Sequence, residues 1–180
     1  MDQYHEYDQI ISQQLESGVI ELVQPEEQKI ADAYYLPHRA VFMPDKSTKT
    51  RIVYNGSACL SKRELSLNNL IYTGCNLLSD LFAVVVCFQF NRIAIVSDIE
   101  KAFLQLSIAH PDRNYVQFLW FDKHDPQFAF SNVIVFHFMR VAFGIIASPF
   151  LLNTTVPHHI TENPNEFTEQ LKRDTFTDTG

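Results

Sequence analysis

One acidic residue directly follows an apolar run, and it is the strongest candidate for chemistry in this chain. Arg92–Ser97 is rich in β-branched residues and predicts a buried strand, which ends on Asp98. A carboxylate at the end of a buried strand usually has a cation partner, because burying the charge alone is costly. Mg²⁺ prefers oxygen ligands, and the backbone carbonyl of Ile99 could supply another. In the alternative interpretation, Asp98 simply caps a helix that begins at Glu100.

Basic residues gather between positions 38 and 64, although the net charge of the chain is −7. A net negative charge argues against nucleic-acid binding, since phosphate neutralisation requires Lys and Arg. The local cluster weakens that objection, because the acidic excess lies largely at the two ends of the chain. The cluster consists of Arg39, Lys46, Lys49, Arg51, Lys62 and Arg63. Its alternative interpretation is a solvated hairpin face without a ligand.

The elements that must position these residues can be read from apolar periodicity in the first half of the chain. Tyr7–Val23 has the spacing of an amphipathic helix. Tyr34–Met43 and Arg51–Tyr54 predict two strands joined by a turn, which together form a basic hairpin. Residues 66–78 predict a loop with short helical pieces. Leu77–Phe90 predicts a buried helix, for which Asn76 is a better N-cap than Asp80.

The second half of the chain mixes strands and helices. Tyr115–Phe121 and Ser131–Phe138 predict two more strands. A helix should open at Ser148-Pro149, with Ser148 as N-cap and Pro149 in the first helical position. Asn165–Lys172 should also be helical. Because the strands look antiparallel, the pattern favours an α+β fold over a doubly wound one.

Composition places the chain among globular proteins. It has 180 residues, of which 46% are hydrophobic, enough for one core. No apolar run reaches the roughly 20 residues that a membrane span needs. The first residues show no secretory signal, and the three cysteines lack CxxC spacing. We therefore expect an intracellular protein, cytoplasmic or nuclear, with no membrane association.

Asp98-Ile-Glu-Lys-Ala-Phe103 closely resembles the first carboxylate motif of reverse transcriptases from long-terminal-repeat retrotransposons, the BEL/Pao group in particular. This resemblance implies that Asp98 is a catalytic metal ligand, assisted by the carbonyl of Ile99. It also implies that Phe103 is the aromatic wall beneath the incoming sugar, which excludes a 2′-hydroxyl. Without the motif, Phe103 would be an ordinary core aromatic.

Three further segments resemble the same family in the same order. Tyr34–Val41 is similar to the start of the fingers, and Thr50–Ala58 to the fingers strand whose arginine contacts the nucleotide triphosphate. Arg51 matches that arginine, since a guanidinium fork suits phosphate oxygens, and Lys49 could assist it. The family usually carries an aspartate where this chain has Asn55. Ser66-Leu-Asn68 is also similar to the loop that follows the hairpin.

Arg140–Phe150 resembles the second conserved motif of reverse transcriptases, a turn and helix that brace the template base and the incoming nucleotide. By this resemblance Gly144 lets the backbone approach the nucleotide closely. Phe143 belongs to the same nucleotide-binding set, in a place that some relatives fill with glutamine. Locally, the segment also reads as a plain turn before a capped helix. The resemblance extends over roughly residues 5–180.

Phe176-Thr-Asp178 resembles the start of the third motif, an aromatic–x–Asp–Asp hairpin that carries the remaining metal ligands. Asp178 would be the second catalytic metal ligand, and Thr179 stands where an acidic or amide residue is expected. A hairpin needs a second strand, but only Thr179 and Gly180 follow Asp178. With this motif truncated and the thumb absent, we expect the isolated chain to have little or no polymerase activity.

The resemblance implies a truncated right-hand polymerase, an α+β fold in which helices flank a mostly antiparallel sheet. Its parts would be an N-terminal helix and linker (1–33), fingers (34–91) and a partial palm (92–180) with fingers-like strands around 112–138. Two Mg²⁺ or Mn²⁺ ions, dNTPs and an RNA/DNA primer–template would be its cofactors and partners.

Two other functions stay open at this stage. The chain could be a non-catalytic interaction module derived from a retrotransposon, with a partner chain at an exposed palm edge. It could instead be a small metal-binding protein using His158 and His159. Adjacent histidines do not share a helix face, however, which disfavours the metal-binding alternative.

Overall fold

The fold is described by a computed structural model over residues 3–25, 33–43, 50–59, 61, 63–77, 80–90, 92, 98–121 and 133–174. Within these residues the chain forms five α-helices and two antiparallel sheets, one of three strands and one of two. The α+β class expected from the sequence is therefore confirmed. No helix in this part of the chain combines the length and the apolar character that crossing a bilayer requires.

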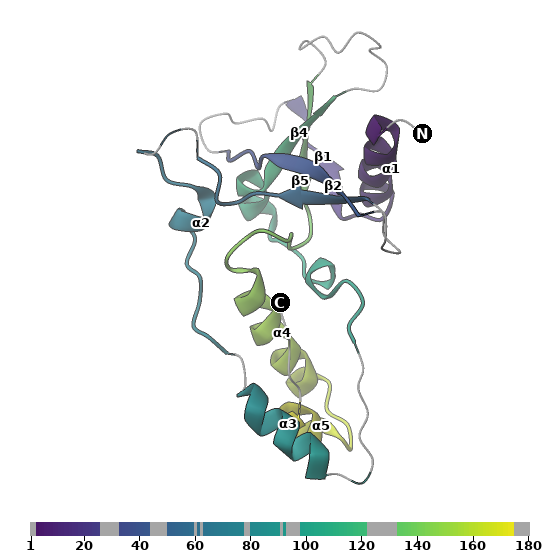
Figure 1. Cartoon of the computed structure of the whole chain (residues 1–180), viewed down its shortest axis with the longest axis vertical. Helices are drawn as coiled ribbons and strands as arrows, with labels where there is room; N and C mark the ends of the chain where they lie inside the picture. The colour runs from purple at the N-terminus through teal and green to yellow at the C-terminus, as the bar shows by residue number, and fades with distance from the viewer. Residues whose placement is uncertain are drawn as a thin grey trace.

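Helices and strands alternate irregularly along the chain. The helices are α1 (Gln3–Glu16), α2 (Leu67–Leu70), α3 (Leu81–Phe90), α4 (Ser148–Glu162) and α5 (Thr168–Asp174), with 3₁₀-helices η3 (Ala102–Gln105) and η4 (His110–Tyr115). The strands are β1 (Ile20–Leu22), β2 (His38–Phe42), β3 (Thr50–Tyr54), β4 (Gln117–Phe121) and β5 (Val133–Phe138). Figure 1 shows both sheets with α1 at one end of the molecule, and α4 leading away towards α3 and α5.

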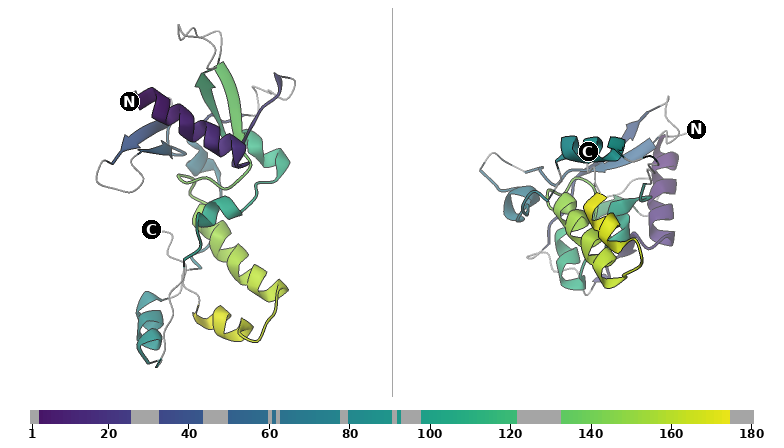
Figure 2. Two further views of the ribbon diagram at one scale, coloured as in Figure 1. Left: turned by 90° about the vertical axis from the view of Figure 1, so that its right-hand side faces the viewer. Right: turned by 90° about the horizontal axis from the view of Figure 1, so that it is seen from below.

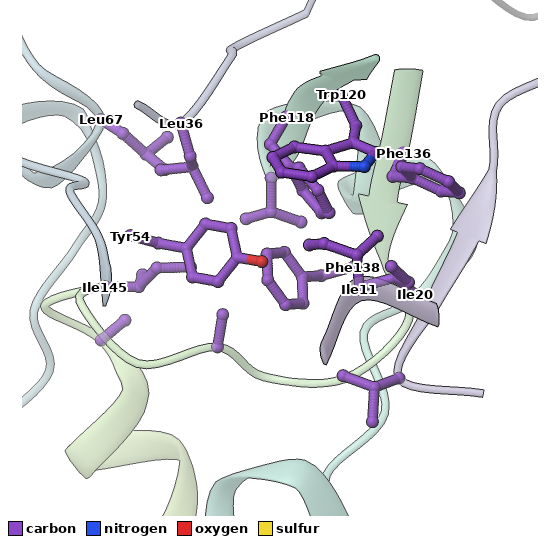
Figure 3. Packing of buried hydrophobic residues seen from close by; sticks show 14 residues of the cluster. Ile11, Ile20, Leu36, Tyr54, Leu67, Phe118, Trp120, Phe136, Phe138 and Ile145 are labelled. Carbon is purple, nitrogen blue, oxygen red and sulfur yellow. The ribbon is translucent and has the colours of Figure 1, made fainter. Parts of the chain in front are cut away.

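The larger sheet has the strand order β1-β5-β4, and β2 pairs with β3 as the predicted hairpin. A cluster of aromatic side chains packs the hairpin onto the larger sheet (Figure 3). Tyr54, at the end of β3, meets Phe138 with ring centroids 4.7 Å apart and Phe118 at 5.2 Å, both nearly edge-to-face. Such contacts add to the gain from apolar burial, so Tyr54 anchors the hairpin to the sheet.

The first helix is shorter than its apolar periodicity predicts. It ends at Glu16, and Ile20–Leu22 forms strand β1 instead of a further helical turn. Gly18 has a φ of +65°, and the N–H of Val19 donates to the carbonyl of Gln14. This is a Schellman C-cap, so the predicted helix Tyr7–Val23 is wrong in its last turns.

The predicted helix over Leu77–Phe90 exists from Leu81 onward, but it is not buried. Phe82 is 77% exposed and Phe90 86%. Its cap is Asp80, whose carboxylate accepts a hydrogen bond from the N–H of Phe82 at 3.0 Å. The choice of Asn76 over Asp80 was wrong, because the helix starts four residues later than the apolar run.

Helix α4 begins where the Ser-Pro pair predicts, but with a different cap. Ala147 is the N-cap residue and Ser148 is already helical. The hydroxyl of Ser148 donates to the carbonyl of Ala142 at 2.8 Å, so it ties the preceding turn to the helix. The helix continues past Pro157 and ends at Glu162. The C-terminal helix α5 starts at Thr168, three residues later than predicted.

Candidate functional site

The basic hairpin presents its two arginines on one exposed face. In the register of β2 with β3, Arg51 pairs with Val41 and Arg39 pairs with Val53. Directly paired residues share a face, as do residues two apart, so Arg39 and Arg51 are diagonal neighbours on the same face. Both arginines are exposed, and neither forms an ion pair with another described residue. The face could bind a phosphate, and its geometry equally fits a solvated surface.

The inner face of the hairpin is held rigidly. His38 donates from Nε2 to the carbonyl of Leu119 at 2.9 Å, and its Nδ1 accepts from the hydroxyl of Tyr7. Burial lowers the pKa of His38, although the bond to Leu119 opposes the shift. Burial also raises the pKa of the Tyr7 and Tyr54 hydroxyls above the usual range. A neutral His38 therefore fixes the hairpin to β4, which leaves the arginine face outward.

The Gly144 turn lies directly against the end of this hairpin. Gly144 has a φ of +91°, and a Cβ there would collide with the carbonyl oxygen of Tyr54. A Cβ on Gly56 would lie 2.7 Å from the carbonyl oxygen of Gly144. Only glycine allows two backbones to approach this closely, so glycine is required at both positions. The backbone of Gly144 therefore lies against the hairpin, whereas its close approach to a nucleotide stays a prediction.

The two predicted aromatic residues meet each other. The rings of Phe103 and Phe143 lie edge-to-face with centroids 4.7 Å apart. Phe103 is 6% exposed and packs in a small cluster with Val141 and Leu152, whereas Phe143 is 61% exposed. Phe103 therefore packs as a core aromatic residue, as the alternative interpretation predicts. Phe143 offers the accessible ring at this place.

Residues 106–108, which follow the first predicted motif, run beside residues 139–141, which lead to Gly144. The N–H of Ile108 donates to the carbonyl of Met139 at 2.8 Å, and the N–H of Val141 donates to the carbonyl of Leu106 at 3.0 Å. Arg140 also donates to the hydroxyl of Ser107 at 2.7 Å. These bonds join the residues just after the first predicted motif to the start of the second, and so bring Phe103 and Phe143 close to each other.

Asp98 and Ile99 are both exposed. The helix that follows them is the 3₁₀-helix η3, which starts at Ala102 with Lys101 as its N-cap and no side-chain capping bond. The interpretation of Asp98 as the cap of a helix beginning at Glu100 is therefore wrong. Lys101 adopts a left-handed φ of +51°, which is uncommon outside glycine and redirects the chain between Asp98 and Phe103.

Several predicted site residues lie outside the described part of the chain. These are Lys49, Asp178 and most of the strand predicted before Asp98. Asp98 and the Ile99 carbonyl have the oxygen chemistry that Mg²⁺ prefers, but they are too few to complete its coordination. Among the described residues, no group of three or more His, Cys, Asp or Glu side chains gathers as metal ligands do.

An ionic cluster on the larger sheet was not anticipated from the sequence. Glu21 accepts hydrogen bonds of 2.5 Å from Arg113 and from His137, which is 3% exposed. Burial alone would raise the pKa of Glu21, but the bonds from His137 and Arg113 lower it below its ordinary value. The three residues lie 24 to 116 positions apart and follow no local pattern, so only the fold brings them together.

Neither a protein-family model nor a curated protein sequence matches this chain.

Proposed function

We propose that this chain carries the fingers and part of the palm of an RNA-directed DNA polymerase from a long-terminal-repeat retroelement of the BEL/Pao type. One observation carries the proposal: segments resembling the motifs of that family, far apart in the sequence, meet at one place. The hairpin end touches the Gly144 turn, the 66–68 loop bonds to both, and Phe103 packs on Phe143.

The arrangement suits nucleotide and template binding. In phosphoryl transfer the protein mainly positions charged groups and supplies electrostatic stabilisation. Arg51 and Arg39 share a face that could bind phosphate oxygens, and the exposed ring of Phe143 could stack on a base or sugar. A divalent ion, when held by Asp98 with further oxygen ligands, would neutralise phosphate charge. Phe103 would hold the ring of Phe143 in place through their edge-to-face contact.

Binding of a primer–template tests the proposal without requiring activity. The probe is fluorescein-labelled oligo(dT) annealed to poly(rA), and fluorescence anisotropy is measured over a series of salt concentrations. We expect salt-dependent binding, which Arg51→Ala should weaken while reducing the slope of log K against log salt by about one. Lys172→Ala on α5 is the matched control, because it removes the same charge from a helix at the other end of the molecule.

Absence of salt-dependent binding would refute the proposal. Equal losses in Arg51→Ala and Lys172→Ala would show that only net charge matters. Primer extension on the same duplex with Mg²⁺ or Mn²⁺ is a separate measurement. Robust extension that Asp98→Ala abolishes would contradict the expectation that this chain is inactive by itself.

A second candidate function, a non-catalytic interaction module, is favoured by helix α3. Its sequence is apolar on all sides except for Gln89, which is typical of a helix buried in a core. Yet Phe82, Phe88 and Phe90 are 77%, 41% and 86% exposed, and Figure 2 shows α3 standing apart from α4 and α5. Such a surface fits a second copy of this chain, with α3 packed on α3.

The exposed area is close to what a dimer requires. An aromatic side chain buries about 200 Å², so the three phenylalanines could contribute roughly 400 Å² from each copy. With Val85, which is 43% exposed, the total approaches the roughly 1,000 Å² of a specific interface. Light scattering should then show a dimer that Phe82→Ser dissociates and Phe167→Ser, on the approach to α5, leaves intact. A monomer at all concentrations would exclude this function.

A further inference from the structure

The side chain of Asn68 joins its own segment to two others, the end of the hairpin and the Gly144 turn, by direct hydrogen bonds. Its Nδ2 donates to the hydroxyl of Ser57 at 2.8 Å and to the carbonyl of Gly144 at 3.1 Å. Its Oδ1 accepts from the backbone N–H of Ile146 at 2.9 Å. Both amide hydrogens and the amide oxygen are therefore used, and each bond crosses to another segment.

The backbone around Asn68 reinforces this link. The N–H of Asn68 donates to the carbonyl of Gly56 at 2.9 Å. A Cβ on Gly56 would lie 2.8 Å from Oδ1 of Asn68, so the amide fills the space between the hairpin end and the Gly144 turn. Ser66, which is 2% exposed, donates from its hydroxyl to Oδ1 of Asn69 at 2.6 Å and so holds α2 in place. The amide of Asn68 thus lies in a preformed, closely packed position.

We propose that Asn68 is a positioning residue, whose amide sets the placement of the arginine face of β2–β3 relative to Gly144 and Phe143. The inference rests on the proposed nucleotide-binding function. It goes beyond the family resemblance, which marked Ser66–Asn68 only as a similar loop. Asn68 touches no ligand itself: it acts through Gly144, whose carbonyl it binds, and through Ser57, three residues after β3.

The chemistry of the amide predicts that a side chain of the same shape but different polarity cannot make the same bonds. An aspartate would keep an acceptor for the N–H of Ile146 but would lose both donors. Its carboxylate would then face the carbonyl oxygen of Gly144, an acceptor against an acceptor. Protonation of that carboxylate returns one O–H donor. The Asn68→Asp variant should therefore recover partly at acidic pH, whereas the neutral Asn68→Leu variant, with neither donor nor acceptor, should not.

The test uses the anisotropy assay with the same poly(rA)/oligo(dT) probe. At pH 7.5, Asn68→Asp and Asn68→Leu should each bind about tenfold more weakly than the wild-type chain, which corresponds to the loss of one to two hydrogen bonds. Between pH 7.5 and pH 5, the ratio of Asn68→Asp to wild-type affinity should rise, and the ratio for Asn68→Leu should stay constant. Asn163→Asp is the matched control, because it adds the same charge at the far end of α4.

Each outcome decides the matter. Wild-type affinity in both Asn68 variants overturns the positioning role and leaves the proposed function standing. A loss without pH recovery in Asn68→Asp, or equal pH behaviour in Asn163→Asp, also overturns it, since general structural or charge effects would then suffice. If the wild-type chain does not bind the probe, the proposed function fails and this inference fails with it. Should the Asn68 variants not fold, Ser57→Ala removes one partner only: a several-fold loss supports the role, and unchanged affinity overturns it.

Discussion

The contact between Gly144 and the hairpin makes a sharp prediction about stability. In Gly144→Ala, the new residue must adopt a φ of +91°, which costs an L-residue about 1–2 kcal/mol. Its Cβ would also overlap the carbonyl oxygen of Tyr54, so the turn and the hairpin must separate. That movement weakens two hydrogen bonds, the one that Asn68 donates to Gly144 and the one that it accepts from Ile146, each worth about 1 kcal/mol. The total loss is about 3–4 kcal/mol.

Gly18→Ala provides the matched control. Gly18 also has a positive φ, of +65°, but a Cβ there meets nothing within 4 Å. The loss of stability in Gly18→Ala should therefore come from the strained backbone alone, about 1–2 kcal/mol. For a chain of this size, each kcal/mol shifts the melting temperature by about 2–4 °C. We expect Gly144→Ala to lower the melting temperature by roughly 10 °C and Gly18→Ala by roughly 4 °C, as measured by circular dichroism.

Equal destabilisation in the two glycine variants would refute this reasoning. It would mean that the Gly144 turn and the end of β3 are not in close backbone contact in solution. The convergence of segments that carries the proposed function would then lose its main support. A larger loss in Gly144→Ala, accompanied by weaker primer–template binding, would connect this contact to the site.

Three further predictions concern parts of the fold that support the hairpin and the sheet. Because burial lowers the pKa of His38, the unfolded chain binds more protons than the folded chain just below about pH 6.5. The free energy of unfolding should therefore fall as the pH drops from about 6.5 to the lowered pKa of His38. In the His38→Gln variant this fall should be smaller. Glu21→Gln should lower the free energy of unfolding by about 1 kcal/mol. The loss is this small because the Glu21 side chain is 36% exposed and solvent weakens its ion pairs. Since the pKa of Glu21 is lowered, its contribution to stability is present above about pH 4.5 and is lost as the pH falls through the lowered pKa. Urea titrations of the wild type should show this loss of unfolding free energy, and titrations of Glu21→Gln should not. In the same titrations, Lys101→Gly should stabilise the chain by about 0.5–1 kcal/mol, because glycine tolerates the left-handed φ of this position. Lys172→Gly, inside helix α5, should destabilise it. A destabilised Lys101→Gly variant would contradict the left-handed backbone at Lys101.

The sequence by itself determined most of the local structure. The strands Tyr34–Met43 and Arg51–Tyr54 and the turn between them predicted the hairpin, and the observed register puts Arg51 and Arg39 on one face. Serine followed by proline located the start of α4 to within one residue. The resemblance of Asp98–Phe103 to a carboxylate motif named candidate residues without any coordinates. These features depend on residues a few positions apart in the chain, so they can be predicted from the order of the residues alone.

Only the tertiary structure decided how the segments meet. Residues 20–22 form strand β1 because they pair with β5, more than 100 residues away, whereas apolar periodicity alone extended α1 past its Gly18 cap. The exposure of α3 could not be predicted, because an apolar run reveals a preference for burial but not whether a partner surface is present. The resemblance of Ser66–Asn68 to the family's loop did not indicate what the amide of Asn68 contacts. Its role arises because two glycines, Gly56 and Gly144, let distant backbones approach until one amide can bond to both sides.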